Sequence, residues 1–445
     1  MILSHVYTAI DSCMKQLSHL LLLLLFPALI GSVEAARPVA TLPFEMSGSY
    51  AVVKMSINGS EPLSFIFDTG VRNTIITHID DNTNVSLNPG REVPVVGLGS
   101  GLDVKGLLSD GNDLKLGKLS MNNRMVMVLE EDVLHLSELN GRKINGLIGV
   151  DVLREYVVEV NYTRRKLIFY DTASFQPPEN FATRDLIIEN NKLYLPMTLF
   201  DSSMKLRTIK MFIDTGALLN AWFLTVNNNA DESKGPKVYA RIGSGFGGDV
   251  NGYLTRIPRI CLEEYCFENP IVAFPDSAVV AEVIKRSDRD GTIGSELLSR
   301  FNLLFDLQRK KLHFKANSFF NAPFVYNIAG MELMQAQALF PGYEVSAVWK
   351  DSPADKAGIR VGDQLIGINT LSVFSFSLTE VRALLQKPSR LPMTVMYLRN
   401  GQQMQAELNM RNRLPVEPEV RNNRITAEPK VRNRITSEPK RVYKP

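Results

Sequence analysis

Two copies of the triplet Asp-Thr-Gly stand 146 positions apart, one beginning at Asp68 and the other at Asp214. Each aspartate follows a short apolar run, so each carboxylate is expected at the end of a buried strand. Two carboxyl groups held about 3 Å apart cannot both ionise, and such a pair shares one proton. The ionised member can then activate water as a general base, while the protonated member polarises a carbonyl group. The pair is therefore suited to hydrolysis of an amide bond.

The residues after each aspartate are of the same types in both copies. A threonine and a glycine follow, namely Thr69 and Gly70 in the first copy and Thr215 and Gly216 in the second. Glycine allows the tight turn that a loop needs in order to present the carboxylate at an interface. A single Asp-Thr-Gly arises by chance in about one chain in ten of this length. Two copies in the same context indicate a shared role.

The triplets belong to a longer internal repeat. Sliding the sequence by 146 positions aligns two glycine-rich stretches, and a one-residue shift then aligns Ile148-Gly149 with Ile293-Gly294. A glycine-rich stretch can be a flap that closes over a substrate or a plain mobile loop. The flap candidates are Gly97, Gly99 and Gly101 in the first copy and Gly243, Gly245 and Gly247 in the second.

Short apolar strands separated by turn residues fill both copies of the repeat. This pattern predicts two all-β lobes at residues 44–173 and 182–320, joined by a proline-containing hinge at 176–180. The composition changes after Pro323, where strands alternate with short helices, and predicts a small α/β domain at 324–410. Residues 411–445 hold ten Lys or Arg against four Glu, with recurring proline, and are expected to be a disordered basic tail.

The N-terminus has the pattern of an export signal. An apolar run from Leu17 to Ile30 follows Lys15 and ends near the small-residue pattern Val33-Glu34-Ala35. Residues 1–36 are therefore predicted to be a signal peptide, which places the mature protein in the periplasm or outside the cell. A membrane anchor is the alternative, but the run is short for a bilayer span, and no stable span is expected after signal removal. The balance of 50 basic and 47 acidic residues argues against a nucleic-acid partner.

Two cysteines beyond the signal, Cys261 and Cys266, flank Glu263-Glu264 in a predicted hairpin. Opposed residues at a non-hydrogen-bonded position have Cα atoms about 4.5 Å apart, which is within the range of a disulfide. An oxidising compartment favours the bridge. Two buried thiols are the alternative.

The two copies resemble the lobes of the pepsin and retropepsin aspartic peptidases over about residues 44–320. The Asp-Thr-Gly loops, the glycine-rich stretches and the signatures Gly146–Gly149 and Gly291–Gly294 carry the resemblance. It implies an all-β bilobal acid-protease fold, in which two β-barrel-like lobes are related by a pseudo-twofold axis. It also implies that Asp68 and Asp214 are catalytic, that their threonines join the two loops, and that the chain is a monomeric endopeptidase without a cofactor.

Two features depart from the pepsin pattern. Val71 and Ala217 follow the glycines, where pepsin-like enzymes have a hydroxyl residue. A carboxylate that lacks this hydrogen bond holds its proton more readily, which predicts an activity optimum less acidic than that of pepsin. The flap tyrosine of pepsin also has no obvious counterpart.

The domain at 324–410 resembles the PDZ domains of bacterial exported proteases. The succession Val345–Val348, Ser352-Pro353-Ala354, Gly362-Asp363 and Leu365–Asn369 carries this resemblance. PDZ domains add an extended peptide to a sheet edge, so a peptide or protein substrate is the expected partner. The candidate carboxylate loop is Gly330, Met331, Glu332 and Leu333, and the candidate pocket residues are Leu378, Val381 and Leu385. Each of them could equally belong to the core.

Two other readings remain beside the peptidase. The lobes could form a non-catalytic cleft in an exported protein that binds peptides through its PDZ domain. A glycosidase also uses two carboxylates, but it does not explain the duplicated loops. The five histidines have no metal-ligand spacing, so no metal site is expected.

Overall fold

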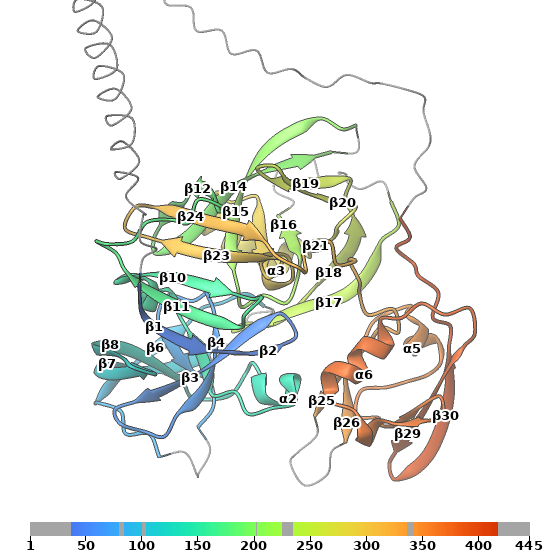
Figure 1. The fold of residues 1–445 in the computed structure, drawn as a ribbon. Helices are drawn as coiled ribbons and strands as arrows, with labels where there is room; N and C mark the ends of the chain where they lie inside the picture. Colours follow the sequence, from blue (N-terminus) through green and yellow to red (C-terminus); the bar gives the residue numbers. More distant parts are fainter. Residues whose placement is uncertain are drawn as a thin grey trace, which may run out of the picture. The chain divides into compact units, whose positions relative to one another are not determined.

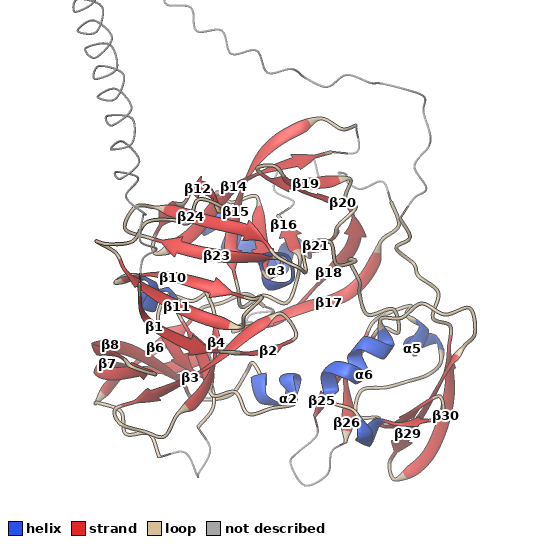
Figure 2. Cartoon of the chain, viewed as in Figure 1, coloured by secondary structure: helices blue, strands red, loops and turns tan. Residues whose placement is uncertain are grey.

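A computed structural model describes residues 37–79, 84–99, 104–201, 203–224, 235–335 and 342–416, with the side chains of 282–286 excepted. The predicted signal peptide (1–36), the flap candidate Gly101 and most of the predicted tail lie outside the described residues. Strands dominate the described chain, as Figure 2 shows.

The first lobe is a sheet that closes on itself. Its elements are β2 (Glu45–Ser47), β3 (Tyr50–Ile57), β4 (Leu63–Phe67), β5 (Thr74–Ile76), β6 (Gly90–Val95), β7 (Val104–Leu116), β8 (Leu119–Leu129), helix α2 (Leu136–Asn140), β9 (Gly146–Ile148) and the 3₁₀ helix η2 (Val150–Leu153). The strand order is β2-β3-β4-β9-β5-β8-β7-β6, and a second pairing of β3 with β7 makes the sheet barrel-like. Asn58 and Gly59, both with positive φ, make the tight turn after β3.

The second lobe repeats this plan. Its elements are β13 (Ile187–Glu189), β14 (Lys192–Phe200), β15 (Leu206–Asp214), β16 (Ala221–Phe223), β17 (Val238–Gly245), β18 (Gly248–Arg256), β19 (Arg259–Leu262), β20 (Tyr265–Glu268), β21 (Ile271–Pro275), helix α3 (Ser277–Arg286), β22 (Gly291–Gly294) and helix α4 (Ser295–Leu298). The strand order is β17-β18-β21-β16-β22-β15-β14-β19-β20, and β13 pairs with β14. In both lobes, the strand before the aspartate pairs in parallel with the strand of the glycine signature.

A further sheet joins the lobes (Figure 1). It contains β1 (Pro38–Pro43), β10 (Tyr156–Asn161), β11 (Lys166–Asp171), β12 (Ala182–Asp185), β23 (Phe301–Asp306) and β24 (Lys311–Ala316), in the order β1-β11-β10-β23-β24-β12. The two lobes meet where β10 pairs with β23. Strand β1 begins at Pro38, before the predicted start of the first lobe at residue 44. One cluster of buried apolar side chains, including Phe67, Ile213 and Phe305, extends through both lobes.

The C-terminal domain is a small α/β unit. Its elements are β25 (Met331–Gln335), β26 (Tyr343–Val348), helix α5 (Pro353–Lys356), β27 (Gln364–Ile368), β28 (Leu371–Ser372), the 3₁₀ helix η3 (Val373–Ser375), helix α6 (Leu378–Leu385), β29 (Met393–Arg399) and β30 (Gln402–Leu408). Ser377 begins α6 with a reciprocal capping box to Glu380. The packed chain continues past the predicted boundary at Met410, because Leu414 is buried.

The predicted fold class is confirmed: the lobes are all-β and barrel-like, and the appended domain mixes strands and helices. Buried apolar side chains of the second lobe, such as Trp222 and Leu254, belong to one cluster with Met331 and Val345 of the C-terminal domain. None of the helices in the described ranges is long and apolar enough to cross a membrane.

Candidate active site

Asp68 and Asp214 are positioned by central, buried strands. All five residues of β4 are buried, and Asp68 follows its last residue. Asp214 is the last residue of β15. The backbone N–H of Asp68 donates to the carbonyl of Ile148 at 2.9 Å, and Asp214 is the register partner of Gly294. The glycine signature of each lobe therefore supports the aspartate of that lobe.

Thr69 and Thr215 cross from one loop to the other. The Thr69 hydroxyl donates to the carbonyl of Ile213 at 2.8 Å and accepts the N–H of Thr215 at 3.1 Å. The Thr215 hydroxyl donates to the carbonyl of Phe67 at 2.8 Å and accepts the N–H of Thr69 at 3.0 Å. Both threonines are buried. Each loop thus supplies the hydrogen-bond partners that the other loop needs.

The two glycines of the triplets lie against the carboxyl groups of the opposite lobe. A methyl group added at Gly70 would lie 2.6 Å from Oδ1 of Asp214, and one added at Gly216 would collide with the carboxyl group of Asp68. Each glycine N–H also donates to the aspartate of its own triplet, at 2.6 Å from Gly70 and 3.0 Å from Gly216. The glycines allow the two carboxyl groups to meet between the lobes.

The electrostatics of the pair favour retention of a proton. Burial raises the pKa of Asp68, and the negative charge of Asp214 raises this pKa further, well above its ordinary value of 3.8. Burial also raises the pKa of Asp214, against hydrogen bonds and a lowering contribution from the charge of Arg289. Val71 and Ala217 bring no hydroxyl, and among the described residues no side-chain hydroxyl donates to either carboxylate.

The glycine-rich stretches of the two lobes meet each other. The N–H of Gly247 donates to the carbonyl of Leu98 at 2.8 Å, and a Cβ at Gly97 would lie 2.8 Å from Cβ of Phe246. Gly99 has φ of +136° and would collide with Gly247 if it carried a side chain. Gly245 likewise faces Leu98, whereas Gly243 faces open space. Phe246 packs against the buried cluster of the first lobe, so the second hairpin reaches across to it.

Sequence reasoning missed two residues beside the pair. Tyr50 is buried, and its burial and the nearby charges of Asp68 and Asp214 raise the pKa of its phenol. Arg289 is buried near Asp214, and burial lowers its pKa to about 10. The repeat contained a signal for Arg289, because the alignment of Ile148-Gly149 with Ile293-Gly294 places this arginine opposite the apolar residue Ile144.

A pocket of about 370 Å³ opens on the first lobe directly after the Asp68 loop in sequence. Its lining combines apolar side chains with two arginines and an amide: Arg72, Asn73, Ile75, Arg91, Leu108, Met125 and Met127. Asn73 donates to the sulfur of Met125 at 3.0 Å, which fixes one wall. This pocket has the size and apolar lining to accept a side chain.

Cys261 and Cys266 form a disulfide across the hairpin of β19 and β20. Their Cα atoms are 4.1 Å apart, and the two residues are register partners. Glu263, with positive φ, makes the turn between them. The bridge therefore closes a strand pair that lies next to β14 in the second lobe.

The candidate peptide-binding residues of the C-terminal domain lie around β25 and α6. Gly330 has φ of +71°, while five side chains are buried in the core of the domain: Met331, Leu333, Leu378, Val381 and Leu385. Glu332 accepts hydrogen bonds from Arg241 of β17 at 2.5 Å and from the Trp349 indole at 2.9 Å.

A PDZ domain adds a peptide strand between the strand and helix that correspond to β25 and α6. Other residues of this chain narrow that space. Arg382 of α6 donates to the carbonyl of Leu333 on β25 at 2.5 Å. A methyl group at Gly141, which ends α2 of the first lobe, would lie 3.1 Å from side-chain atoms of both Gln335 and Leu378. An incoming peptide would therefore have to displace Arg382 from the strand edge.

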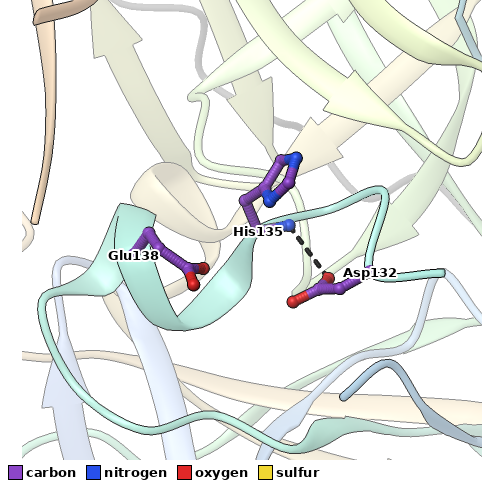
Figure 3. Close-up of side chains that lie close together, drawn as sticks. All are labelled: Asp132, His135 and Glu138. Carbon is purple, nitrogen blue, oxygen red and sulfur yellow. Dashed lines mark hydrogen bonds between the residues drawn. The ribbon is translucent and has the colours of Figure 1, made fainter. Parts of the chain in front are cut away.

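Within the described ranges, Asp132, His135 and Glu138 form a group that could hold a metal ion, with ligand atoms within 4.8 Å of one another (Figure 3). The His135 side chain is exposed, and its backbone N–H donates to the Asp132 carboxylate at 3.0 Å. This bond is an ordinary one at the start of a helix, so the arrangement has a structural explanation without a metal.

Comparisons with known proteins cover parts of the chain. Residues 53–152, which include Asp68, match the family model described as aspartyl protease, and residues 344–396 match the model described as PDZ domain. Among solved structures, the aspartic proteinase from Irpex lacteus is similar with a TM-score of 0.39 and 12% identity, over 64% of this chain and 98% of that chain. No curated protein matches the chain.

Proposed function

The chain combines an aspartyl protease domain with a PDZ domain, and we propose that it is an endopeptidase whose water molecule is activated between Asp68 and Asp214. The observation that carries this proposal is the reciprocal crossing of Thr69 and Thr215, which brings one carboxyl group from each lobe to a common interface. A purely structural pair of carboxyl groups would be costly here, because Asp68 is buried and burial raises the pKa of both aspartates.

The proposed reaction uses the single proton that the pair retains. Burial raises the pKa of both aspartates, so one member of the pair is protonated while the other is ionised and acts as the base. The ionised aspartate takes a proton from water while the water oxygen bonds to the peptide carbonyl carbon, and the protonated aspartate donates a hydrogen bond to the carbonyl oxygen. The proton taken from water then passes to the amide nitrogen, the C–N bond breaks, and the pair is again left with one proton.

The two glycine-rich hairpins are proposed to close over the bound peptide. Their direct contact through Leu98 and Gly247 supports this role, because two flaps that touch can exclude water from the carboxyl pair. A substrate would enter when this contact opens. The flexibility of glycine suits such a movement.

The PDZ domain is proposed to bind an extended peptide of a protein substrate between β25 and α6. This role requires release of Arg382 from Leu333. A short peptide with an apolar C-terminus, added in excess, should inhibit cleavage of protein substrates but spare cleavage of short peptides that reach only the carboxyl pair. Equal inhibition of both would mean that the competitor acts at the cleft, and no inhibition would exclude the recruiting role.

Export through the N-terminal segment remains part of this proposal. The apolar run and the small-residue pattern before residue 37 support it. N-terminal sequencing of the mature protein after fractionation of the producing cells should find a start near Arg37 in the exported fraction. An intact N-terminus inside the cell would contradict this.

The central experiment is incubation of the purified protein with a peptide library, with mass-spectrometric detection of products. Cleavage should be blocked by pepstatin and absent in Asp68→Asn and Asp214→Asn. Peptide binding without any cleavage would instead favour the non-catalytic alternative. Cleavage that persists in both variants would exclude the shared carboxyl pair.

A further inference from the structure

Among the residues that the structure describes, Arg289 is a buried cation that forms no ion pair with a carboxylate. Only 6% of the residue is exposed, and its guanidinium lies 4.7 Å from the centre of the Phe212 ring and 5.0 Å from that of Trp222. Its Nε is buried without a hydrogen-bond partner, and among the described residues no group accepts a hydrogen bond from its side chain. Contacts with two aromatic faces offset only part of the cost of burying such a charge.

The carboxylates next to Arg289 in sequence are engaged elsewhere. Asp288 accepts a hydrogen bond from Nζ of Lys210 at 2.7 Å. Asp290 accepts the backbone N–H of Lys210 at 2.8 Å, and its own N–H donates to the Lys210 carbonyl at 2.9 Å. These bonds hold the Arg289 backbone in a defined position beside β15.

The first lobe has the same arrangement with an apolar residue in place of the arginine. Asn145 donates to the carbonyl of Ser64 at 2.7 Å and accepts the Ser64 N–H at 3.1 Å, as Asp290 does with Lys210. The residue before Asn145 is Ile144, which is fully buried. It belongs to a cluster with Val52, Ile66, Ile75 and Leu147, where the second lobe has aromatic rings around a cation.

Both positions lie beside residues that precede the carboxyl pair. Phe212 and Asp214 are two apart in β15, and residues two apart in a strand lie on the same face. Ile66, which shares a cluster with Ile144, is the equivalent residue in β4. Arg289 contacts Phe212, so it lies on the Asp214 side of the pair. The lowering effect of its charge on the pKa of Asp214 agrees with this location.

We propose that Arg289 is a specificity-determining residue, which binds the acidic side chain of a substrate residue next to the scissile bond. On the other side of that bond, the pocket of the first lobe accepts an apolar side chain, because Ile75 of the cluster around Ile144 lines it. The inference rests on the proposed peptidase function, because it assigns a substrate preference to the same cleft. A glutamate or aspartate side chain supplies the acceptor that the buried guanidinium lacks.

The test begins with the full-length protein and a peptide library of random sequence. Products should show Asp or Glu at one of the two positions flanking the cleaved bond and an aliphatic or aromatic residue at the other. No cleavage of any peptide would overturn the peptidase function, and this inference with it. Cleavage without an acidic preference at either flanking position would overturn the inference alone.

Variants of Arg289 then test the residue itself on matched peptides that carry Glu, Gln or Leu at the preferred acidic position. The wild-type protein should have a kcat/KM for the Glu peptide about 10-fold or more above that for the Gln peptide, since a charge-assisted bond is lost. Arg289→Met should bring this ratio close to one, and Arg289→Lys should restore part of it.

A uniform change for all three peptides in Arg289→Met would overturn the proposal, because it would show that Arg289 acts only through the fold or through Asp214. The library preference of the wild-type protein stands as an independent readout if Arg289→Met fails to fold.

Discussion

Replacement of Thr69 by valine tests whether the crossed hydroxyls hold the lobes together. Valine keeps the shape of the side chain but leaves the Ile213 carbonyl and the Thr215 N–H, both in the buried interface, without partners. Each orphaned group costs about 1–3 kcal/mol, so the two together cost about 2–6 kcal/mol. This is a large part of the total stability of about 5–15 kcal/mol that is typical of a protein domain.

Thr74 provides a matched control for this substitution. It is fully buried in the first lobe, and its hydroxyl has no hydrogen-bond partner. Thr74→Val should therefore be neutral or slightly stabilising, while Thr69→Ser, which keeps the hydroxyl, should lose much less than Thr69→Val.

The assay is urea unfolding followed by the fluorescence of Trp222, with peptide cleavage measured in the same samples. Thr69→Val should lower the urea midpoint by about 0.7 M or more, given slopes of about 1–3 kcal/mol per M. Activity should be lost at lower urea than in the control. The other tryptophan, Trp349, lies in the C-terminal domain, so Trp349→Phe in all variants isolates the signal of the second lobe. Equal midpoints for Thr69→Val and Thr74→Val would refute the reasoning.

Three further predictions follow from the site and the domain contacts. The pKa values of Asp68 and Asp214 are raised on folding, so the wild-type pair contributes stability at low pH and loses it as the pH rises above the ordinary value of 3.8. Asp68→Asn should thus unfold at a higher temperature than wild type at pH 7, and this difference in unfolding temperature should shrink toward pH 4; a constant difference would contradict this. Gly99→Ala forces a side chain against Gly247, so it should open the flap contact and lower kcat/KM about 10-fold or more. Gly243→Ala is the control: its added methyl group meets open space, and kcat/KM should change less than 2-fold. Equal effects of the two variants would exclude the flap role. Truncation after Asn321 should lower the unfolding midpoint, because side chains packed between the second lobe and the C-terminal domain become exposed, and an unchanged midpoint would show that the domain is tethered without structural support.

The sequence predicts those parts of the molecule that depend on short stretches of neighbouring residues. Residues close together in the chain determine the Asp-Thr-Gly loops, the strands before them and the hairpin around Cys261. The internal duplication predicts that the two lobes pair. The predicted first lobe does not include strand β1, because its six residues form an edge strand whose pairing with β11 depends on a segment more than 120 positions later.

The contacts that were not predicted join distant segments. Two hydrogen bonds, between Leu98 and Gly247 and between Arg241 and Glu332, depend on the positions of whole hairpins. No local sequence pattern predicts these positions. Arg289 is a different case, because the sequence shows that the residue is an arginine but does not show that its side chain is buried. A charged residue in a loop is usually exposed, and only the aromatic side chains around it identify this one as buried.

The crossed threonines also set the moment at which the molecule can first act. A chain emerging during synthesis completes the first lobe long before Thr215 exists, and N-terminal domains fold first. At that stage Thr69 has no partner from the second loop, and Asp68 has no second carboxyl group. The active arrangement therefore appears only when both lobes have folded against each other. In the proposed peptidase, a chain that is only half synthesised therefore lacks the carboxyl pair, and the interface between the lobes is the last part of the site to assemble.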